Sequence, residues 1–280
     1  MSGTPIAWVD GRLVGDAPAL RAFDHGVTVG DGVFETCSVR EGQAFALSRH
    51  LRRLATSAAG LGLVSPDLDL VRAGVAEVLA AGPLPWGRLR ITVTGGPGPL
   101  GSDRADVAPT YVVLASPTPR PAPTASVAVA PWVRNERSAV AGIKTTSYAE
   151  NVVALAYARE RGASEALLAN TRGELCEGTG SNVLLALGGQ LVTPPLGSGA
   201  LAGITRELLL QWAASEGLGI LERVVPLEEL AVAEEVALLS STRDVQPVHA
   251  VDGRALTAPG PLVTAAAGVF TRAAAADTDP

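Results

Sequence analysis

GIKTTSYAEN, at residues 142–151, contains the only lysine of the chain, Lys144, among 22 lysines and arginines. Drift from lysine to arginine wherever charge alone matters explains the missing lysines, but it leaves this one unexplained. Arginine cannot replace a lysine whose amine must lose its proton, because a guanidinium stays protonated whereas a desolvated amine can become neutral and form a Schiff base. We therefore interpret Lys144 as a residue kept for its chemistry.

The composition indicates a globular enzyme or binding protein. The 280 residues are 47% hydrophobic and 18% charged, enough for one large domain or two ordinary ones. The net charge of -6, without a basic cluster, argues against a nucleic-acid partner. The opening MSGTPIAWVDGRL lacks the pattern of a secretory signal, and no apolar run is long enough to span a membrane, so we expect a cytoplasmic protein. Two isolated cysteines and three scattered histidines predict neither a disulfide framework nor a metal site.

Hydrophobic periodicity predicts a mixed first half. IAWVDGRLV is typical of a hairpin, and the alternation over residues 24–45 predicts further strands. Helical spacing follows in LSRHLRRLATSAAGLGL, with Ser48 as a candidate N-cap, and in LDLVRAGVAEVLAAG. GRLRITVTGG and APTYVVLAS then return to strand periodicity. The proline-rich segment SPTPRPAPTAS indicates a linker, so we predict an N-terminal α+β domain at 1–115, a linker at 116–126 and a C-terminal domain at 127–280.

The second half alternates between strands and helices. SVAVAPWV predicts a strand, AENVVALAYARERG a helix ended by Gly162, and residues 165–195 a run of strands with turns at TRG and LGG. A second helix is predicted in GITRELLLQWAASEGL, a short helix and strand in PLEELAVAEEVALLSS, and a last strand pair in VHAVDGRAL. The tail, TRAAAADTDP, is expected to fray.

Four further motifs have an ordinary interpretation when each is taken alone. LCEGTGSNV places Glu177 in a turn, where a glutamate is usually solvated. LAGITREL opens a helix whose free N–H groups suit a phosphate, or which is simply capped. HLRRLATSA carries Arg52 and Arg53 on a helix, most simply as a solvated face. SSTRDVQPV is a hydroxyl-rich turn of the kind that caps strands.

Together with GDGVFET at residues 30–36, these motifs resemble the class IV aminotransferases in order and spacing, from the GDGVFET block to VDG near residue 252. These fold-type-IV pyridoxal 5'-phosphate enzymes include D-amino-acid, (R)-amine and branched-chain transaminases and aminodeoxychorismate lyase. The resemblance implies an α+β fold with a smaller N-terminal α/β domain and a larger C-terminal pseudo-barrel domain that binds the cofactor. It also implies a homodimer in which the neighbouring subunit's loop closes each active site.

The resemblance assigns the cofactor-binding residues one by one. Lys144 resembles the lysine that forms the Schiff base with the cofactor and moves the proton, and Glu177 the acid that pairs with the pyridine nitrogen. Tyr148 resembles the tyrosine that approaches the ring oxygen. The remaining set resembles the phosphate-binding residues: Arg53, Ile204, Thr205 and Ser241.

Several positions are expected to face the substrate, and some of them depart from the family pattern. Val29 stands where an aromatic residue is common, His25 stands where an arginine is usual, and GGPGPLGSDR lacks the RxH pair that binds a carboxylate in D-amino-acid transaminases. The substrate class is therefore open. The expected substrate-binding residues are Val29, Phe34, Glu35, Arg90, Thr242 and Arg243, and Arg134 is a further candidate for binding a carboxylate.

Three functions follow from these residues. The first is a transaminase acting on D-amino acids or (R)-amines, with L-branched-chain amino acids next. The second is 4-amino-4-deoxychorismate lyase, which begins with the same proton removal and then releases pyruvate to leave 4-aminobenzoate. The third, a non-catalytic binding protein that kept the fold, predicts a lost lysine, and Lys144 is intact.

Overall fold

The computed structural model describes residues 5–15 and 17–280 and divides into two compact units. The first unit comprises Met1–Arg120, Ile143–Ser147 and Thr278–Pro280, and the second comprises Pro121–Gly142 and Tyr148–Asp277. The sequence predicts two domains that are each continuous in the chain, divided at the proline-rich segment. In the structure the segment that carries Lys144 belongs to the first unit, although it comes after that segment. Residues 1–4, on which the expectation about the opening of the chain partly depends, lie outside the described residues.

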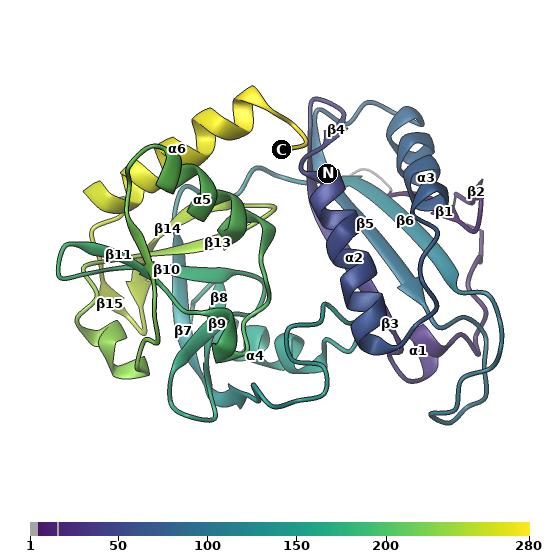
Figure 1. Ribbon diagram of the computed structural model, residues 1–280, viewed down its shortest axis with the longest axis horizontal. Helices are drawn as coiled ribbons and strands as arrows, with labels where there is room; N and C mark the ends of the chain where they lie inside the picture. The colour runs from purple at the N-terminus through teal and green to yellow at the C-terminus, as the bar shows by residue number, and fades with distance from the viewer. Residues whose placement is uncertain (1–4, 16) are drawn as a thin grey trace. The chain divides into compact units, whose positions relative to one another are not determined.

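A six-stranded antiparallel sheet forms the first unit, in the order β2-β1-β6-β5-β3-β4 (Figure 1). The predicted hairpin is confirmed: Asp10 and Gly11 both have positive φ, 45° and 92°, as a two-residue turn between twisted strands requires. The strands are β1 (Ile6–Val9), β2 (Arg12–Leu13), β3 (Gly32–Arg40), β4 (Gln43–Ala44), β5 (Trp86–Thr94) and β6 (Thr110–Pro117).

The two predicted helices of this unit, α2 (Leu47–Leu61) and α3 (Leu68–Ala80), are confirmed, and they pack on one face of the sheet (Figure 1). Val33 and Cys37 of β3 join the leucines of α2 in a buried core. Glu35, which alternates with them, points to this same face, whereas Phe34 and Thr36 point to the other face. The N-cap assigned to Ser48 is wrong. The residue before α2 is Ala46 in a left-handed conformation, and the Ser48 hydroxyl donates to Asp279 at 2.6 Å.

Two other local predictions are also wrong. Residues 24–28 are expected to be strand, but they form the short helix α1 (His25–Thr28), because the Asp24 carboxylate accepts from the Gly26 N–H and caps it. The tail is expected to fray, but residues 271–276 complete the helix α6 (Pro261–Ala276). After it, Ala46 N–H donates to the Thr278 carbonyl at 2.7 Å.

The second unit is built on a sheet in the order β12-β11-β10-β13-β14-β7-β8-β9, with β15 paired to β14. Helix α4 packs against β7 and β8, while α5 and α6 pack against each other and the β13–β14 region. Gly162 follows α4 with φ 74°, which confirms the predicted helix end. The strands are β7 (Ala125–Arg134), β8 (Glu165–Asn170), β9 (Leu175–Gly178), β10 (Asn182–Leu187), β11 (Gln190–Thr193), β12 (Ile220–Glu222), β13 (Glu235–Ser240), β14 (Asp244–Val251) and β15 (Arg254–Ala255). The helices are α4 (Ala149–Glu160), α5 (Ile204–Ser215), α6, and the 3-10 turns η1 (Leu196–Ser198) and η2 (Leu227–Ala231).

Within residues 5–15 and 17–280, none of the helices combines the length and the apolar character needed to cross a bilayer.

Candidate active site

Lys144 belongs to a short segment that runs beside the start of β3. Its carbonyl accepts from the Phe34 N–H at 3.0 Å, and the Thr146 N–H donates to the Gly32 carbonyl at 2.8 Å. The Lys144 N–H also donates to the Ser57 hydroxyl of α2 at 3.3 Å. The backbone of the lysine is therefore fixed by both the sheet and a helix of the same unit, which leaves the conformation of its side chain as the main freedom.

The amine of Lys144 lies 4.3 Å from the centroid of the Phe34 ring. The guanidinium of Arg90, from β5, lies 3.7 Å from the same centroid. Cations are attracted to an aromatic ring by its quadrupole, so Phe34 holds both cations on the sheet face that is not covered by α2 and α3. Of the predicted substrate-facing residues, Phe34 and Arg90 are thus brought together with the amine of Lys144.

Glycine is required where the GDG motif approaches the lysine segment. Gly30 has φ 70°, and a Cβ there would lie 2.7 Å from the Ser147 hydroxyl oxygen. The Gly30 carbonyl accepts from the hydroxyls of Thr146 and Ser147 at 2.7 and 3.0 Å. The glycine therefore lets two hydroxyls next to Lys144 bind the GDG turn, a close approach that a side chain at Gly30 would prevent.

On the other face of β3, Glu35 is fully buried and bound by two residues of α2. Arg53 donates through Nε and Nη2 at 2.7 and 2.6 Å, and His50 Nδ1 lies 2.6 Å from the same carboxylate. Burial acts to raise the pKa of Glu35, but the Arg53 charge and the hydrogen bonds from Arg53 and His50 outweigh it and lower that pKa to about 2. Burial also lowers the pKa of His50, so we infer a neutral ring that donates from Nδ1.

Glu35 is therefore not a substrate-lining residue of the kind the resemblance implies. Successive residues of a strand point to opposite faces, so Phe34 and Glu35 cannot both line one pocket. Glu35 instead orients Arg53, whose neighbour Arg52 is exposed on the same helix. Val29, also expected near the substrate, is 42% exposed.

Glu177 lies in the second unit, on β9, with little of its side chain exposed. One carboxylate oxygen accepts from the Leu201 N–H at 2.9 Å, and the other lies 3.4 Å from Nη2 of Arg134. The same nitrogen donates to Asn151 at 3.1 Å, and the Asn151 amide donates to the Thr179 carbonyl at 2.5 Å. Arg134, a predicted carboxylate-binding candidate, thus contacts the carboxylate of Glu177.

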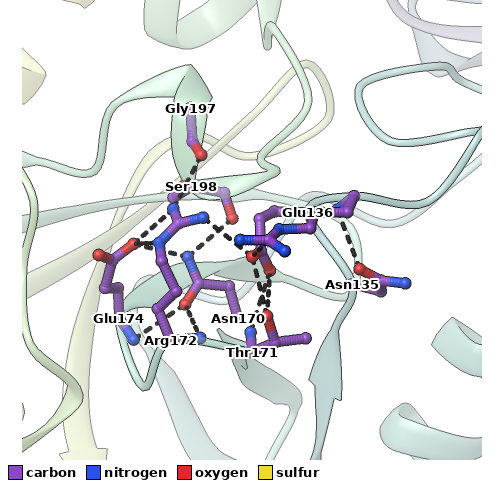
Figure 2. A network of polar contacts seen from close by, with 9 residues as sticks. Asn135, Glu136, Asn170, Thr171, Arg172, Glu174, Gly197 and Ser198 are labelled. Atoms are coloured by element: carbon purple, nitrogen blue, oxygen red, sulfur yellow. Dashed lines mark hydrogen bonds and ion pairs between the residues drawn. The ribbon is translucent and has the colours of Figure 1, made fainter.

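A polar network fixes the chain that leads to Leu201. Figure 2 shows Arg172 between two glutamates, donating to Glu136 at 2.9 Å and to Glu174 at 2.7 Å, while its Nη2 also donates to the Gly197 carbonyl at 3.0 Å. Hydrogen bonds from the backbone N–H of Glu136 and from the Thr171 hydroxyl lower the pKa of Glu136 to about 2. Because the network holds η1, it also holds the N–H that binds Glu177.

A cavity of about 280 Å³ lies beside this network in the second unit. Its lining includes Glu136, Gly142, Leu196, Ala200 and Ala202. Apart from Glu136 the side chains among these are small or apolar, and two of them flank Leu201.

The N-terminus of α5 is suited to an anion. Gly203 precedes the helix without a side-chain cap, and Ile204 and Thr205 in the first turn are buried. A Cβ at Gly203 would collide with the Asn182 side chain. Uncapped N–H groups and the helix dipole favour a negative charge here, so these residues fit the phosphate expected from the sequence.

The turn between β13 and β14 carries Ser241, Thr242 and Arg243, all half-buried. The Arg243 N–H donates to the Ser240 carbonyl at 3.1 Å, and its guanidinium forms a 2.6 Å ion pair with Glu165 of β8. The predicted substrate arginine is thus engaged by a buried carboxylate of its own unit. Tyr148 lies at the start of α4, where it precedes the first helical residue.

Three residues with a part in these arrangements are missed by sequence reasoning. His50 is separated from Arg53 by three positions, a helical spacing that places both on one face and could have revealed it. Asn151 and Glu165 carry no such signal, since their partners are far away in the chain.

The family model for amino-transferase class IV matches residues 32–251. The chain is 33% identical to a putative branched-chain-amino-acid aminotransferase of Methanocaldococcus jannaschii, covering 89% of this chain and 88% of the relative. It is 30% identical to a bifunctional aminodeoxychorismate lyase / D-amino acid transaminase of Mycobacterium tuberculosis, covering 90% and 92%. It is 32% identical to a D-alanine aminotransferase of Bacillus licheniformis, covering 90% and 91%.

Solved structures agree with these relatives. A branched-chain aminotransferase from Thermoproteus uzoniensis, solved with norvaline, has a TM-score of 0.89 at 29% identity, covering 95% of this chain and 93% of that one. A hypothetical aminotransferase from Mycobacterium tuberculosis, at 30% identity and covering 96% and 98%, gives 0.84 in its PLP-bound form and 0.83 with α-ketoglutarate and PMP. A 4-amino-4-deoxychorismate lyase from Pseudomonas aeruginosa gives 0.82 at 32% identity, covering 98% and 100%.

The predicted α+β fold of type IV and the predicted cofactor are confirmed by these likenesses. The chain belongs to the class IV aminotransferase family and is a pyridoxal-phosphate-dependent enzyme.

Proposed function

We propose that the enzyme moves an amino group between a D-amino acid or an (R)-amine and a keto acid. Two relatives of nearly full coverage, from Mycobacterium tuberculosis and Bacillus licheniformis, are named for D-amino acid or D-alanine transamination, and a related structure holds α-ketoglutarate. The archaeal relatives favour L-branched-chain amino acids, which we place second.

The observation that carries the proposal is the single lysine, tied to β3 and α2 with its amine against Phe34. When bound, pyridoxal phosphate supplies an electron sink for negative charge at the substrate carbon. In this proposal the Lys144 amine would move a proton between Cα of the substrate and C4' of the cofactor. A guanidinium cannot perform this step, because it does not give up its proton at neutral pH.

The other residues hold and orient the cofactor and the substrate. Glu177 keeps a proton at the ring nitrogen, and the Leu201 N–H fixes the carboxylate for this role. Tyr148 serves the ring oxygen, and Arg90 and Thr242 serve the substrate carboxylate, whereas the Arg243 guanidinium is already paired with Glu165. The phosphate-binding set comprises Arg53, Ile204, Thr205 and Ser241.

A direct test combines spectroscopy with a substrate panel. The purified protein with cofactor should absorb near the visible edge, and borohydride should abolish this band and leave the label on Lys144. D-amino acids and (R)-amines should then yield keto products faster than L-branched-chain amino acids. A faster reaction with L-valine or L-leucine would overturn the substrate assignment but leave the cofactor chemistry intact.

The second candidate function is 4-amino-4-deoxychorismate lyase. It is favoured by the bifunctional mycobacterial relative and by the likeness to the Pseudomonas lyase over nearly the whole chain. The two functions separate in one assay: aminodeoxychorismate should give pyruvate and 4-aminobenzoate without a keto acceptor if the lyase assignment is right.

The homodimer remains a prediction. It follows from the family resemblance, and fold-level analogy is its only support. A monomeric mass in solution, with activity retained at high dilution, would contradict it.

A further inference from the structure

A second carboxylate of the second unit, Glu165 on β8, is almost as deeply buried as the core and is not used by the proposed chemistry. It is 4% exposed. Its Oε1 accepts from the Gly180 N–H at 2.7 Å, from the Ser181 hydroxyl at 3.1 Å and from the Thr179 hydroxyl at 3.2 Å. Its Oε2 pairs with the Arg243 guanidinium at 2.6 Å. One carboxylate therefore binds two turns that are separated by some sixty residues.

The first of these turns follows Glu177 directly. The Gly178 N–H donates to the Ser181 carbonyl at 2.7 Å, which closes the turn, and the Thr179 N–H donates to the Ala166 carbonyl beside Glu165. A Cβ at Gly178 would lie 2.7 Å from Glu165 Oε1 and 2.5 Å from the Ser181 hydroxyl oxygen. The glycine after Glu177 is thus a site of close approach by the Glu165 carboxylate.

The second turn holds Ser241 and Thr242. Arg243 closes it through its N–H to Ser240, and its Nε donates to the Ser240 hydroxyl at 3.2 Å. Because its Nη2 is bound to Glu165, the guanidinium is fixed at both ends. The position of the Ser241–Thr242 backbone then depends on where Glu165 holds the arginine.

We propose that Glu165 is a positioning residue that sets the relative placement of the carboxylate Glu177 and the Ser241–Thr242 turn. This inference rests on the proposed function, in which Glu177 serves the ring nitrogen of the cofactor and Ser241 serves its phosphate. The ring nitrogen and the phosphate belong to one small molecule, so binding and catalysis need both turns at the right separation. Glu165 provides a single fixed point for both.

An ionised carboxylate suits this task better than an amide. It offers acceptor sites on both oxygens, which match three donors on one side and a guanidinium on the other. Glutamine keeps one acceptor oxygen, but it turns an NH₂ group toward either Arg243 or the Glu177 turn. Hydrogen bonds to a charged group are about twice as strong as neutral ones, so the substitution loosens the arginine side most.

The test uses three variants of the full-length enzyme, each measured for its pyridoxal phosphate Kd, and for kcat and KM at saturating cofactor. Glu165→Gln should weaken cofactor binding about tenfold or more and change kcat by less than about threefold. Arg243→Lys should do the same for cofactor binding. Ser181→Ala combined with Thr179→Val, which removes two donors near Glu177, should lower kcat about tenfold with little change in Kd.

Cofactor Kd values for single and double variants show whether Glu165 acts through Arg243 or whether the two residues act independently. If Glu165 acts through Arg243, the double variant Glu165→Gln/Arg243→Lys should bind cofactor no more weakly than the worse single variant, because contacting residues are not additive. Glu235→Gln is the matched control, since Glu235 is also a buried glutamate of this unit and its carboxylate accepts from the N–H groups of Leu262 and Val263 at the start of α6. This control variant should lower Tm, but it should not weaken cofactor binding selectively while leaving kcat nearly unchanged.

Several outcomes overturn the proposal. Variants that lose only Tm, as the control does, would make Glu165 purely structural, and additive losses in the double variant would remove the coupling to Arg243. If Glu165→Gln does not fold, the other two variants still test the proposal. Arg243→Lys must weaken cofactor binding, and Ser181→Ala combined with Thr179→Val must lower kcat. A wild-type protein that binds no pyridoxal phosphate would instead refute the proposed function.

Discussion

Two buried glutamates, one in each unit, are held near an arginine in different ways. Glu35 is bound at 2.6–2.7 Å by two nitrogens of Arg53 and by His50, and its pKa falls to about 2. Glu177 accepts a backbone N–H from Leu201 at 2.9 Å, and the Arg134 guanidinium lies farther away, at 3.4 Å.

This difference in binding suggests that the two glutamates have different roles. A carboxylate bound at short range by a bidentate guanidinium and an imidazole is an orienting group, and the group it orients is Arg53. Glu177, in contrast, is positioned by a backbone N–H and a longer ion pair, and in the proposed function it serves the ring nitrogen of the cofactor. We therefore expect variants of Glu35 to affect stability first and variants of Glu177 to affect turnover first.

Lys144→Arg is expected to have the largest effect on turnover, and the effects of variants at Glu35 and Glu177 can be compared with it. It should leave the thermal unfolding midpoint nearly unchanged and reduce turnover by at least about 10³-fold, because the guanidinium cannot act as a neutral amine. Single-turnover kinetics and near-ultraviolet absorbance of the variant with cofactor provide the measurement. Lys144→Ala should be equally inactive but partly rescued by a small added amine. An active Lys144→Arg enzyme would show that the lysine is an accident of drift.

Glu177→Gln should come next. A neutral amide cannot keep the ring nitrogen protonated, so kcat should fall by about two orders of magnitude while cofactor stays bound. Glu35→Gln is the contrasting variant: it should reduce stability and change turnover less. Equal losses of turnover in the two variants, or unchanged turnover in Glu177→Gln, would break the comparison.

Arg53→Ala should weaken cofactor affinity by about tenfold or more, more than it slows the loaded enzyme, if Arg53 binds the phosphate. It should also destabilise the fold by about 3–5 kcal/mol, because it leaves Glu35 as a buried charge without its guanidinium. Equilibrium unfolding in urea and cofactor titration measure the two effects separately.

Two controls accompany this variant. Arg52→Ala, on the exposed neighbour in α2, should change neither quantity, and similar behaviour of the two would mean that the wrong arginine is assigned. The double variant Arg53→Ala/Glu35→Gln should recover part of the stability, because the uncompensated charge is gone, but none of the cofactor affinity. Recovery of affinity as well would reduce Arg53 to a structural partner of Glu35.

The smallest expected effect is the pH dependence of stability. The folded-state pKa of Glu35 lies below its ordinary value of 4.5, so its contribution is complete above pH 4.5 and is lost as the pH falls through about 2. His50 acts earlier: its folded-state pKa is lowered from 6.5, so the unfolded chain takes up a proton first and stability declines below pH 6.5. Urea unfolding between pH 8 and 5 should show a decline of at most about 1.4 kcal/mol per pH unit from this group, absent in His50→Asn. A decline of the same size in His50→Asn would assign it to another group.

Local pattern was enough to predict much of the sheet and helix content. The Asp10-Gly11 hairpin, the α2 and α3 stripes and the end of α4 at Gly162 each follow from spacing or from one residue's conformational freedom. One of two local errors has a local cause and the other a distant one. Asp24 caps a helix turn inside an apparently alternating stretch, and Ser48 finds a partner at the far end of the chain instead of capping. Distant contacts override propensity where they supply a stronger bond.

The sequence by itself determined the family and its cofactor, because a lone lysine, an acid in a glycine-rich turn and a helix start suited to phosphate are recognised by side-chain type and spacing, on which reactivity depends. Tertiary structure alone decided the partners. It paired Arg53 with Glu35 across α2 and β3, Arg243 with Glu165, and it joined the Lys144 segment to the first unit. The two ion pairs join residues that are not neighbours in the chain, and they are selected because a buried charge without a counter-ion is strongly destabilising, which no local pattern records.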